Sequence, residues 1–253
     1  MSILDRFRID GRAAIVTGAS AGLGVAIAVG LAEAGADVVL AARRVDGLEA
    51  TRARVEAAGR RAVVVPTDVA VVEDCDRLVD TAMRELGRVD ILVNNAGVAG
   101  AAPATREDPD HFRRILDVNL HGTYWTTKAC GRVMRPGSSV VNISSMLGFI
   151  TGGLPQAAYA TSKAGLLGLT RDLAGQWTGR KGIRVNAIAP GWFHSEMIEQ
   201  YEPGYLEERM HRILAGRIGD PEELAAAVLF LASDASSYMT GQVIIYDGGV
   251  CIS

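Results

Sequence analysis

The segment that decides the fold runs from Ala13 to Gly24 and reads AAIVTGASAGLG. A short apolar run ends at Thr17, glycines follow at positions 18, 22 and 24, and an apolar stretch of helical length comes next. Glycines between a strand and a helix let the backbone approach a pyrophosphate, and the helix N-terminus offers N–H groups and a positive dipole end to that anion. The segment therefore predicts a strand, a phosphate-binding turn and a helix, although its spacing is GxxxGxG and not the general GxGxxG.

Two other interpretations of this segment are open. The glycines can form a turn that binds nothing. Residues 13–32 also carry no charge, which makes the stretch long enough to cross a bilayer. Four glycines, Thr17 and Ser20 within it favour a buried strand and helix over a membrane span.

Six further apolar runs resemble the first and alternate with stretches of helical length. Most are rich in valine and isoleucine, as strands buried on both faces are, and this alternation predicts a parallel sheet. The runs are AAIVTG (13–18), DVVLAA (37–42), AVVVPTD (62–68), DILVNNAG (90–97), SVVNISS (139–145), RVNAIAPG (184–191) and QVIIYDGG (242–249). We predict an α/β fold: a single Rossmann-like, doubly wound parallel sheet of about seven strands with helices on both faces.

Local signals add boundaries to this architecture. Asp108-Pro109 and Asp220-Pro221 each place an N-cap acceptor before a proline at the first helical position, so each predicts a helix start. Residues 192–215 lack the strand–helix pattern, are rich in aromatics and are interrupted by Pro203-Gly204, which is typical of a lid over a site. No linker divides the chain, so we expect one domain over residues 1–253.

Composition excludes several classes of protein. The 253 residues include 26 Lys+Arg and 29 Asp+Glu, a net charge of -3, which argues against a sequence-independent grip on nucleic acid. Three cysteines without a CxxC pair exclude a disulfide framework and favour a reducing compartment, and four histidines without ligand-like spacing predict no metal site. The opening residues have no apolar core typical of a signal peptide, so we expect a cytoplasmic protein that binds no membrane.

Two arginines, Arg43 and Arg44, follow the second predicted strand, where an NAD site usually has an acid for the ribose 2′-hydroxyl. A guanidinium instead matches the 2′-phosphate of NADP bidentately. The chemistry favours NADP(H), with NAD(H) possible. Two solvated surface arginines are the alternative interpretation.

Tyr159 and Lys163 are four residues apart in a stretch that reads as a helix, so they lie one turn apart on one face. An ammonium beside a phenol stabilises the phenolate, which makes Tyr159 a candidate proton donor to a ketone or acceptor from an alcohol. Such pairs are common by chance on helices, so this pair is informative only together with other motifs.

The wider pattern resembles the short-chain dehydrogenase/reductase family in its compact form of about 250 residues. The matching motifs occur in order along essentially the whole chain: TGASAGLG (17–24), Asp68-Val69, NNAG (94–97), Asn119, NISS (142–145), YATSK (159–163), and Pro190-Gly191 with a hydroxyl at Ser195. The resemblance implies an oxidoreductase that transfers a hydride between NADP(H) and a ketone or secondary alcohol, as a carbonyl reductase or alcohol dehydrogenase. The alternatives are an NAD-dependent secondary-alcohol dehydrogenase and a non-catalytic dinucleotide-sensing module.

The resemblance also implies roles for single residues. Tyr159 would be the general acid/base, Lys163 would hold the nicotinamide ribose and bias the tyrosine, and Ser145 would bind the substrate oxygen. Asn119 would support a water that relays protons to Lys163. The cofactor would contact Gly18, Ser20, Gly22, Leu23, Gly24, Arg43, Asp68, Val69, Asn95, Ala96, Gly97, Val118, Tyr159, Lys163, Pro190, Gly191, Phe193 and Ser195. The substrate, a small and apolar carbonyl or alcohol compound, would contact Ser145, Met146, Tyr159, Trp192 and His194. Relatives form dimers, commonly within tetramers, so we expect a homo-oligomer.

This chain departs from the family pattern in three places. Ser145 precedes Tyr159 by 14 residues, one more than is common, so Ser144 is the other candidate for the catalytic hydroxyl. Ser195 replaces the usual threonine and keeps the hydroxyl. Ala21 stands where some NADP-dependent relatives have a basic residue, so recognition of the 2′-phosphate depends mainly on Arg43. Enoyl reduction is disfavoured, because relatives that perform it have a longer gap between tyrosine and lysine.

Overall fold

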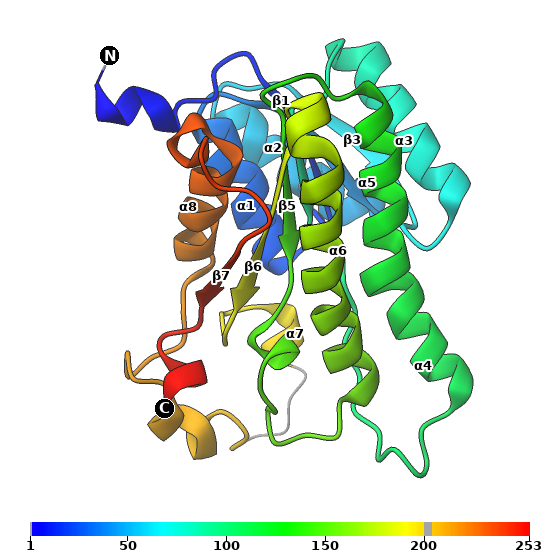
Figure 1. The fold of residues 1–253 in the computed structure, drawn as a ribbon, viewed down its shortest axis with the longest axis vertical. Coiled ribbons are helices and arrows are strands. Elements are labelled where there is room, and N and C mark those ends of the chain that lie inside the picture. Colours follow the sequence, from blue (N-terminus) through cyan, green and yellow to red (C-terminus); the bar gives the residue numbers. More distant parts are fainter. Residues whose placement is uncertain (1, 200–203) are drawn as a thin grey trace.

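The computed structural model describes residues 2–199 and 204–253, without the side chains of residues 197 and 199. In this part of the chain, seven parallel strands form one sheet in the order β3-β2-β1-β4-β5-β6-β7 (Figure 1). The strands are β1 (Ala13–Thr17), β2 (Asp37–Ala42), β3 (Ala62–Pro66), β4 (Ile91–Asn94), β5 (Ser139–Ile143), β6 (Arg184–Pro190) and β7 (Val243–Tyr246). Each predicted apolar run contains one of them, so the predicted sheet is confirmed.

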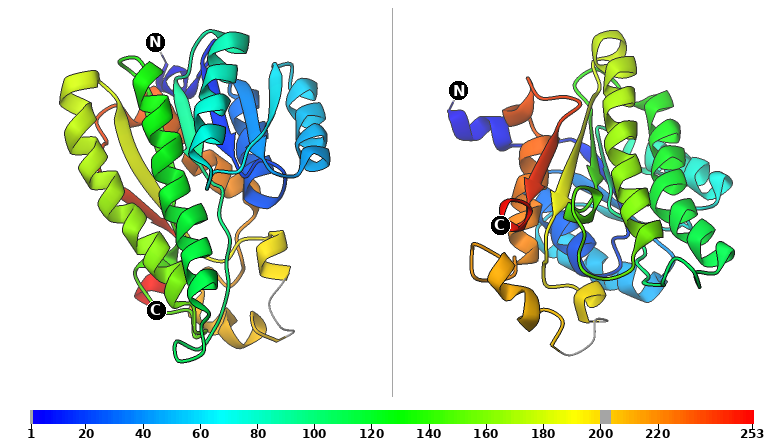
Figure 2. Two further views of the ribbon diagram at one scale, coloured as in Figure 1. Left: turned by 90° about the vertical axis from the view of Figure 1, so that its right-hand side faces the viewer. Right: turned by 60° about the horizontal axis from the view of Figure 1, so that its bottom comes forward.

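Helices connect the strands and cover both faces of the sheet, as the two views of Figure 2 show. The helices are α1 (Gly22–Glu33), α2 (Val45–Ala57), α3 (Val72–Leu86), α4 (Pro109–Leu116), α5 (Gly122–Val133), α6 (Ala157–Lys181), α7 (Glu196–Glu199) and α8 (Pro221–Ala232). Both predicted helix starts are confirmed. Asp108 caps α4 by accepting a hydrogen bond from Asp110 N–H, and Asp220 caps α8 in a capping box with Glu223.

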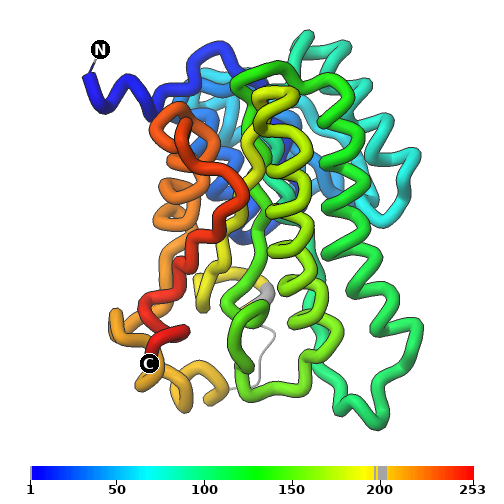
Figure 3. The backbone as a smooth tube through the Cα atoms, viewed as in Figure 1, coloured from blue at the N-terminus to red at the C-terminus, as the bar shows by residue number. Residues whose placement is uncertain are grey.

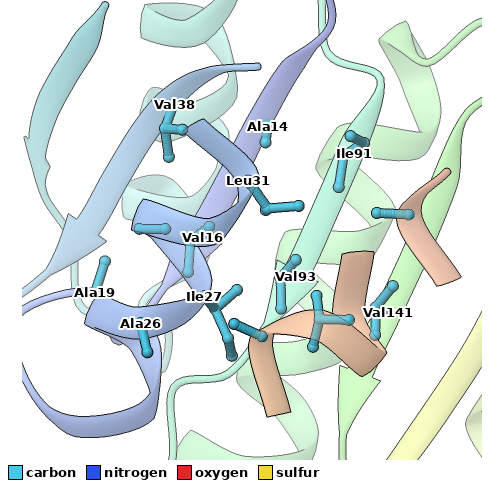
Figure 4. Close-up of a cluster of buried hydrophobic side chains, with 14 of the residues drawn as sticks. Ala14, Val16, Ala19, Ala26, Ile27, Leu31, Val38, Ile91, Val93 and Val141 are labelled. Carbon is cyan, nitrogen blue, oxygen red and sulfur yellow. The ribbon is translucent and has the colours of Figure 1, made fainter. Parts of the chain in front are cut away.

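Two hydrophobic cores lie on opposite faces of the sheet. One contains residues of α1, α2 and α8, and in Figure 4 Ile27 and Leu31 of α1 lie near Val16, Ile91 and Val93 of the strands. The other contains residues of α3, α5 and α6. Alternate residues of a strand enter opposite cores, as a sheet buried on both faces requires.

A third buried cluster lies beyond the carboxyl ends of the strands and includes Met146, Tyr159, Trp192, Tyr205 and Ile213. The tube in Figure 3 shows residues 204–215 beside the C-terminal residues at this end of the molecule. Ala215 N–H donates to the carbonyl oxygen of Gly248 at 3.0 Å. This cluster therefore holds the non-repeating segment against the end of the sheet.

One long helical run deviates from regular α-helix. Residues 109–133 continue from α4 to α5 through a π-helical turn, Asp117–His121, which contains Asn119. Such turns insert an extra residue and are frequent at functional sites. No helix among the described residues has the length and hydrophobicity needed to cross a membrane.

Candidate active site

A cleft of about 500 Å³ opens at the carboxyl ends of the strands. It lies where the strand order reverses, because β1 is flanked by β2 on one side and β4 on the other, and such crevices bind ligands in open α/β sheets. Thr17 Oγ1 accepts hydrogen bonds from the N–H groups of Asn95 and Ala96, both at 3.0 Å. Asn95 Nδ2 donates to the carbonyl oxygens of Thr17 and Gly18. These bonds fasten the loop after β4 to the glycine turn after β1.

The cleft gathers nearly all of the residues that the sequence assigns to the site. Its walls include Gly18, Ser20, Gly22, Leu23, Gly24, Arg43, Asp68, Val69, Asn95, Ala96, Gly97, Val118, Ser145, Met146, Tyr159, Lys163, Pro190, Gly191, Trp192, Phe193 and Ser195. Residues from every part of the chain thus meet at one end of the sheet.

The glycine turn presents the N-terminus of α1 to the cleft. Gly18 and Gly22 have φ angles of +67° and +55°, in the left-handed region that favours glycine. A Cβ atom at Gly24 would strike the carbonyl oxygen of Gly18, so only glycine allows this close approach. Ala21 provides no side-chain cap, and the first turn of α1 contains no acidic residue. The helix dipole and uncapped N–H groups therefore suit an anion.

Charged side chains line the edge of the cleft beside the end of β2. Arg43 Nη1 lies 4.0 Å from Asp68 Oδ2, and both side chains are exposed. Arg44 makes a different pair: its Nη2 lies 2.9 Å from Oε2 of Glu196, the first residue of α7. This pair joins the segment after β2 to the segment after β6. The Arg43 guanidinium lies farther from its carboxylate than the Arg44 guanidinium does, so Arg43 is the more available of the two for a ligand.

Helix α6 places Tyr159 and Lys163 one turn apart, and both are buried. Lys163 Nζ lies 5.7 Å from the centroid of the Tyr159 ring and donates to the carbonyl oxygen of Ile143 at 2.8 Å. Burial lowers the pKa of Lys163 to about 8, because the charged form loses its hydration. The hydrogen bond therefore holds the ammonium in place, and the ammonium loses its proton at a lower pH than an exposed lysine does.

The two candidate serines have different partners. Ser144 Oγ donates to the carbonyl oxygen of Lys163 at 2.8 Å, so its proton is engaged inside the protein. Ser145 Oγ accepts from Leu147 N–H at 3.1 Å and caps the short 3₁₀ turn Met146–Gly148. A hydroxyl that accepts this bond can still donate its own proton. These contacts favour Ser145 as the group that would meet a substrate oxygen.

Asn119 does not line the cleft but lies directly behind it, fully buried in the π-helical turn. Its Oδ1 accepts from Val98 N–H at 2.8 Å, and its Nδ2 donates to Val98 O and to Ser162 Oγ. A Cβ atom at Gly97 would lie 3.4 Å from both Asn119 Oδ1 and Lys163 Nζ. The amide therefore positions the loop beside the lysine.

The segment after β6 forms the opposite wall. Phe193 pairs with Gly219 in a β-bridge, and its ring stacks on Tyr246 with 6.0 Å between centroids. Ser195 Cβ lies 3.4 Å from where a Cβ at Gly22 would stand. This wall therefore comes close to the glycine turn.

One predicted substrate contact, His194, is not found in the cleft. His194 is exposed, lies 3.9 Å from Asp220 through Nε2, and is not among the lining residues. Phe149 and Tyr205 do not line the cleft either; Phe149 is exposed and Tyr205 is buried in the third cluster. Tyr201, another aromatic of the expected lid, lies outside the described residues.

The structure adds lining residues that sequence reasoning missed, among them Thr67, Val98, Ile143 and Glu196. Each of the four directly adjoins a predicted or candidate residue, namely Asp68, Gly97, Ser144 or Ser195, so adjacency could have found them. Among the described residues, no group of three or more His, Cys, Asp or Glu side chains could hold a metal ion.

A parallel sheet with a switch-point cleft, an anion-binding glycine turn and a tyrosine–lysine pair defines the class of dinucleotide-binding α/β oxidoreductases. Comparison with known proteins agrees. The family model described as Enoyl-(Acyl carrier protein) reductase matches residues 18–251. The chain is 37% identical to 2-dehydro-3-deoxy-D-gluconate 5-dehydrogenase of Dickeya dadantii, covering 98% of each chain. It is 39% identical to galactitol 2-dehydrogenase (L-tagatose-forming) of Cereibacter sphaeroides, covering 97% of each.

A solved structure of an Agrobacterium tumefaciens protein with bound NADP has a TM-score of 0.89 and 38% identity, over 98% of this chain and 100% of that one. The chain therefore belongs to the short-chain dehydrogenase/reductase family. It is an NAD(P)-dependent oxidoreductase that acts on alcohol and keto groups.

Proposed function

We propose that this enzyme interconverts a ketone and a secondary alcohol with NADP(H), as a carbonyl reductase or alcohol dehydrogenase. One observation carries the proposal: Ser145, Tyr159 and Lys163 line the same cleft as the anion-binding turn. The three side chains come from the end of β5 and from α6, and the turn follows β1. Proton transfer and cofactor binding can therefore take place within one cleft.

The residues present fit a nicotinamide dinucleotide. A Cβ at Gly18 or Gly24 would strike atoms of the glycine turn or of the loop after β4, so glycine at these positions keeps the turn and the loop closely packed at the cleft. Glycines at such a turn let the backbone approach a pyrophosphate. The glycine turn would hold the pyrophosphate, Asp68 and Val69 would face the adenine, and Pro190 to Phe193 would hold the nicotinamide. Bound NADP(H) would supply or accept the hydride.

The protein's own groups would handle the proton and the developing charge. Ser145 donates a hydrogen bond to the substrate oxygen and stabilises the negative charge that grows there during reduction. Tyr159 gives its phenolic proton to that oxygen in reduction and takes a proton from the alcohol in oxidation. Lys163, held by the Ile143 carbonyl, stabilises the phenolate. Asn119 supports the route by which water returns a proton to Lys163.

Arg43 supports NADP(H) over NAD(H). Strand β2 ends at Ala42 without an acid for a ribose 2′-hydroxyl, and Arg43, the next residue, lines the cleft with an exposed side chain. The A. tumefaciens relative with bound NADP, which shares 38% of its residues, also supports this preference. NAD(H) is the alternative cofactor.

The further features that we propose concern the whole protein. Residues 1–253 would form a single catalytic domain in which 192–215 act as a substrate lid over a small carbonyl or alcohol compound. A homo-oligomer, either a dimer or a tetramer, and a cytoplasmic location complete the proposal. Cys75 and Cys130 are buried and unpaired, which supports a reducing compartment.

Replacing Tyr159 by phenylalanine tests the proposed reaction. Tyr159→Phe should lower turnover of a ketone panel by at least about a thousandfold, since proton transfer contributes roughly that much. NADPH affinity, measured by fluorescence titration, should change little. Tyr238→Phe, at a fully exposed tyrosine, is the matched control and should keep full activity. Normal turnover by Tyr159→Phe would refute the assigned role.

A further inference from the structure

The side chains around the reacting groups are uncharged on the side away from the cofactor turn. Val98, Met146, Leu147, Trp192 and Ile198 line the cleft, and all five pack in or against the buried cluster that contains Tyr159. We call this set the substrate pocket. Apart from Lys163, the charged residues that line the described cleft lie at its other edge: Arg43, Arg44, Asp68 and Glu196. A substrate beside Ser145 would therefore meet an apolar wall.

The nearest arginine along the lid is engaged elsewhere. Arg209 stacks its guanidinium on the Tyr205 ring, with 3.9 Å from Cζ to the ring centroid. Its Nε donates to the carbonyl oxygen of Gly152 and its Nη1 to that of Tyr205. Arg209 does not line the cleft. It serves to hold the lid to the loop after β5.

In its first part the lid carries glutamates and no lysine or arginine, and its two arginines, Arg209 and Arg212, come later in the segment. Between Arg184 and Arg209 there is no lysine or arginine, whereas Glu196, Glu199, Glu202, Glu207 and Glu208 lie in that interval. Glu196 is paired with Arg44, and Glu208 lies 3.3 Å from Arg209. An anion that entered the pocket would lose its hydration, and none of the five apolar side chains named above would give it a charged partner.

We propose that the substrate of this enzyme is uncharged: a neutral ketone or secondary alcohol whose reacting molecule carries no carboxylate or phosphate. This inference rests on the proposed function and narrows its substrate class. The pocket disfavours anions because its five side chains are apolar, and the cation that lines the described cleft beside them, Lys163, already donates to the carbonyl oxygen of Ile143. The anionic cofactor is admitted by a separate set of groups, the glycine turn and Arg43.

Matched pairs of substrates test the inference. We would measure NADPH-dependent reduction of keto esters and of the keto acids with the same carbon skeleton, over aliphatic, cyclic and aromatic pairs. The kcat/KM values of the esters should be at least about a hundredfold higher than those of the acids, since burying a carboxylate without a partner should lower kcat/KM by about that factor or more. Keto acids reduced as well as or better than their esters would overturn the inference and leave the proposed reaction intact. Turnover of neither member by protein that still binds NADPH would overturn the proposed function, and this inference with it.

A charge introduced into the pocket gives an independent check. Ile198 lines the cleft from α7 and is half-buried, so a long side chain there can reach the pocket. Ile198→Arg should lower the ratio of kcat/KM for the keto ester to kcat/KM for the keto acid by at least about tenfold, because the guanidinium can pair with the carboxylate. Ile198→Gln, which is polar but uncharged, should leave the ratio unchanged. NADPH titration of both variants verifies that they are folded, and an unchanged ratio in folded Ile198→Arg counts against the inference.

Discussion

The buried Lys163 should make the stability of the protein depend on pH in a way that one substitution can isolate. Lys163 is buried, its ammonium donates to the carbonyl oxygen of Ile143, and burial lowers its pKa from 10.5 to about 8. Below pH 8 the folded protein holds an ammonium that would be better hydrated in the unfolded chain. Burial of the charged lysine therefore lowers the free energy of unfolding by its full amount below pH 8. This loss of stability disappears as the pH rises toward 10.5.

The size of this effect follows from the same values. The interval from about 8 to 10.5 corresponds to about 3 kcal/mol at 1.36 kcal/mol per pH unit. Over the experimentally convenient range from pH 7 to pH 10, we expect about 2 kcal/mol of it to appear. Lys163→Met removes the titrating group and keeps most of the side-chain length. The free energy of unfolding of the wild type minus that of Lys163→Met should therefore rise by about 2 kcal/mol between pH 7 and pH 10.

Urea denaturation of the cofactor-free protein, followed by circular dichroism, measures this difference. Making both proteins in a Tyr159→Phe background removes the titration of the neighbouring phenol. Lys181→Met is a matched control at the exposed end of the same helix, since Lys181 also donates to a backbone carbonyl at 2.8 Å and lies 5.6 Å from an aromatic ring. It measures what replacing an exposed lysine of this helix does to the free energy of unfolding at each pH. A difference for Lys163→Met that is flat or falls with pH would refute the argument from burial.

Three further substitutions test other parts of the cleft. Arg43→Ala should weaken NADPH binding by at least about tenfold while NADH changes by less than about twofold, measured by fluorescence titration; an equal loss for both cofactors argues against a 2′-phosphate contact. Ser145→Ala should lower kcat by a factor of roughly 10²–10³ and change the free energy of unfolding little. Ser144→Ala should lower the free energy of unfolding by about 1 kcal/mol, because it removes a buried hydrogen-bond donor. If kinetics and urea titrations show the reverse pattern, the two serines exchange roles. Gly24→Ala should abolish binding of both cofactors, since the added methyl would strike a backbone oxygen in the turn, and normal affinity by calorimetry would contradict the proposed cradle.

Much of the fold could be predicted because its signals are local. The valine- and isoleucine-rich runs, the glycines after Thr17 and the two Asp-Pro pairs each act through neighbours in the chain, by periodicity, backbone freedom and capping. Parallel strands then bring their carboxyl ends to one edge, so residues that follow the runs converge there without further information. The spacing of Tyr159 and Lys163 likewise needed only the helical repeat.

Contacts between distant segments could not be predicted in the same way. Arg44 meets Glu196, 152 residues further along, and nothing in either neighbourhood indicates the other. Ser144 and Ser145 differ only in which backbone groups the folded chain brings to them. His194 is held outside the cleft lining by contacts with a distant segment: its N–H donates to the carbonyl oxygen of Gly219, and its Nε2 lies 3.9 Å from Asp220 Oδ1.

Sequence alone was enough to predict the succession of strands and helices and the glycine turn, since these depend on residues close together in the chain. The proposed reacting groups came from motifs spread along the chain and from the family resemblance that they carry. Folding in three dimensions was needed to bury Lys163, to place Asn119 in a π-helical turn behind the cleft, and to gather apolar side chains of distant segments beside Ser145. The physical reason is that hydration and electrostatic environment belong to the packed surfaces of several elements at once, and no local pattern encodes which surfaces will meet.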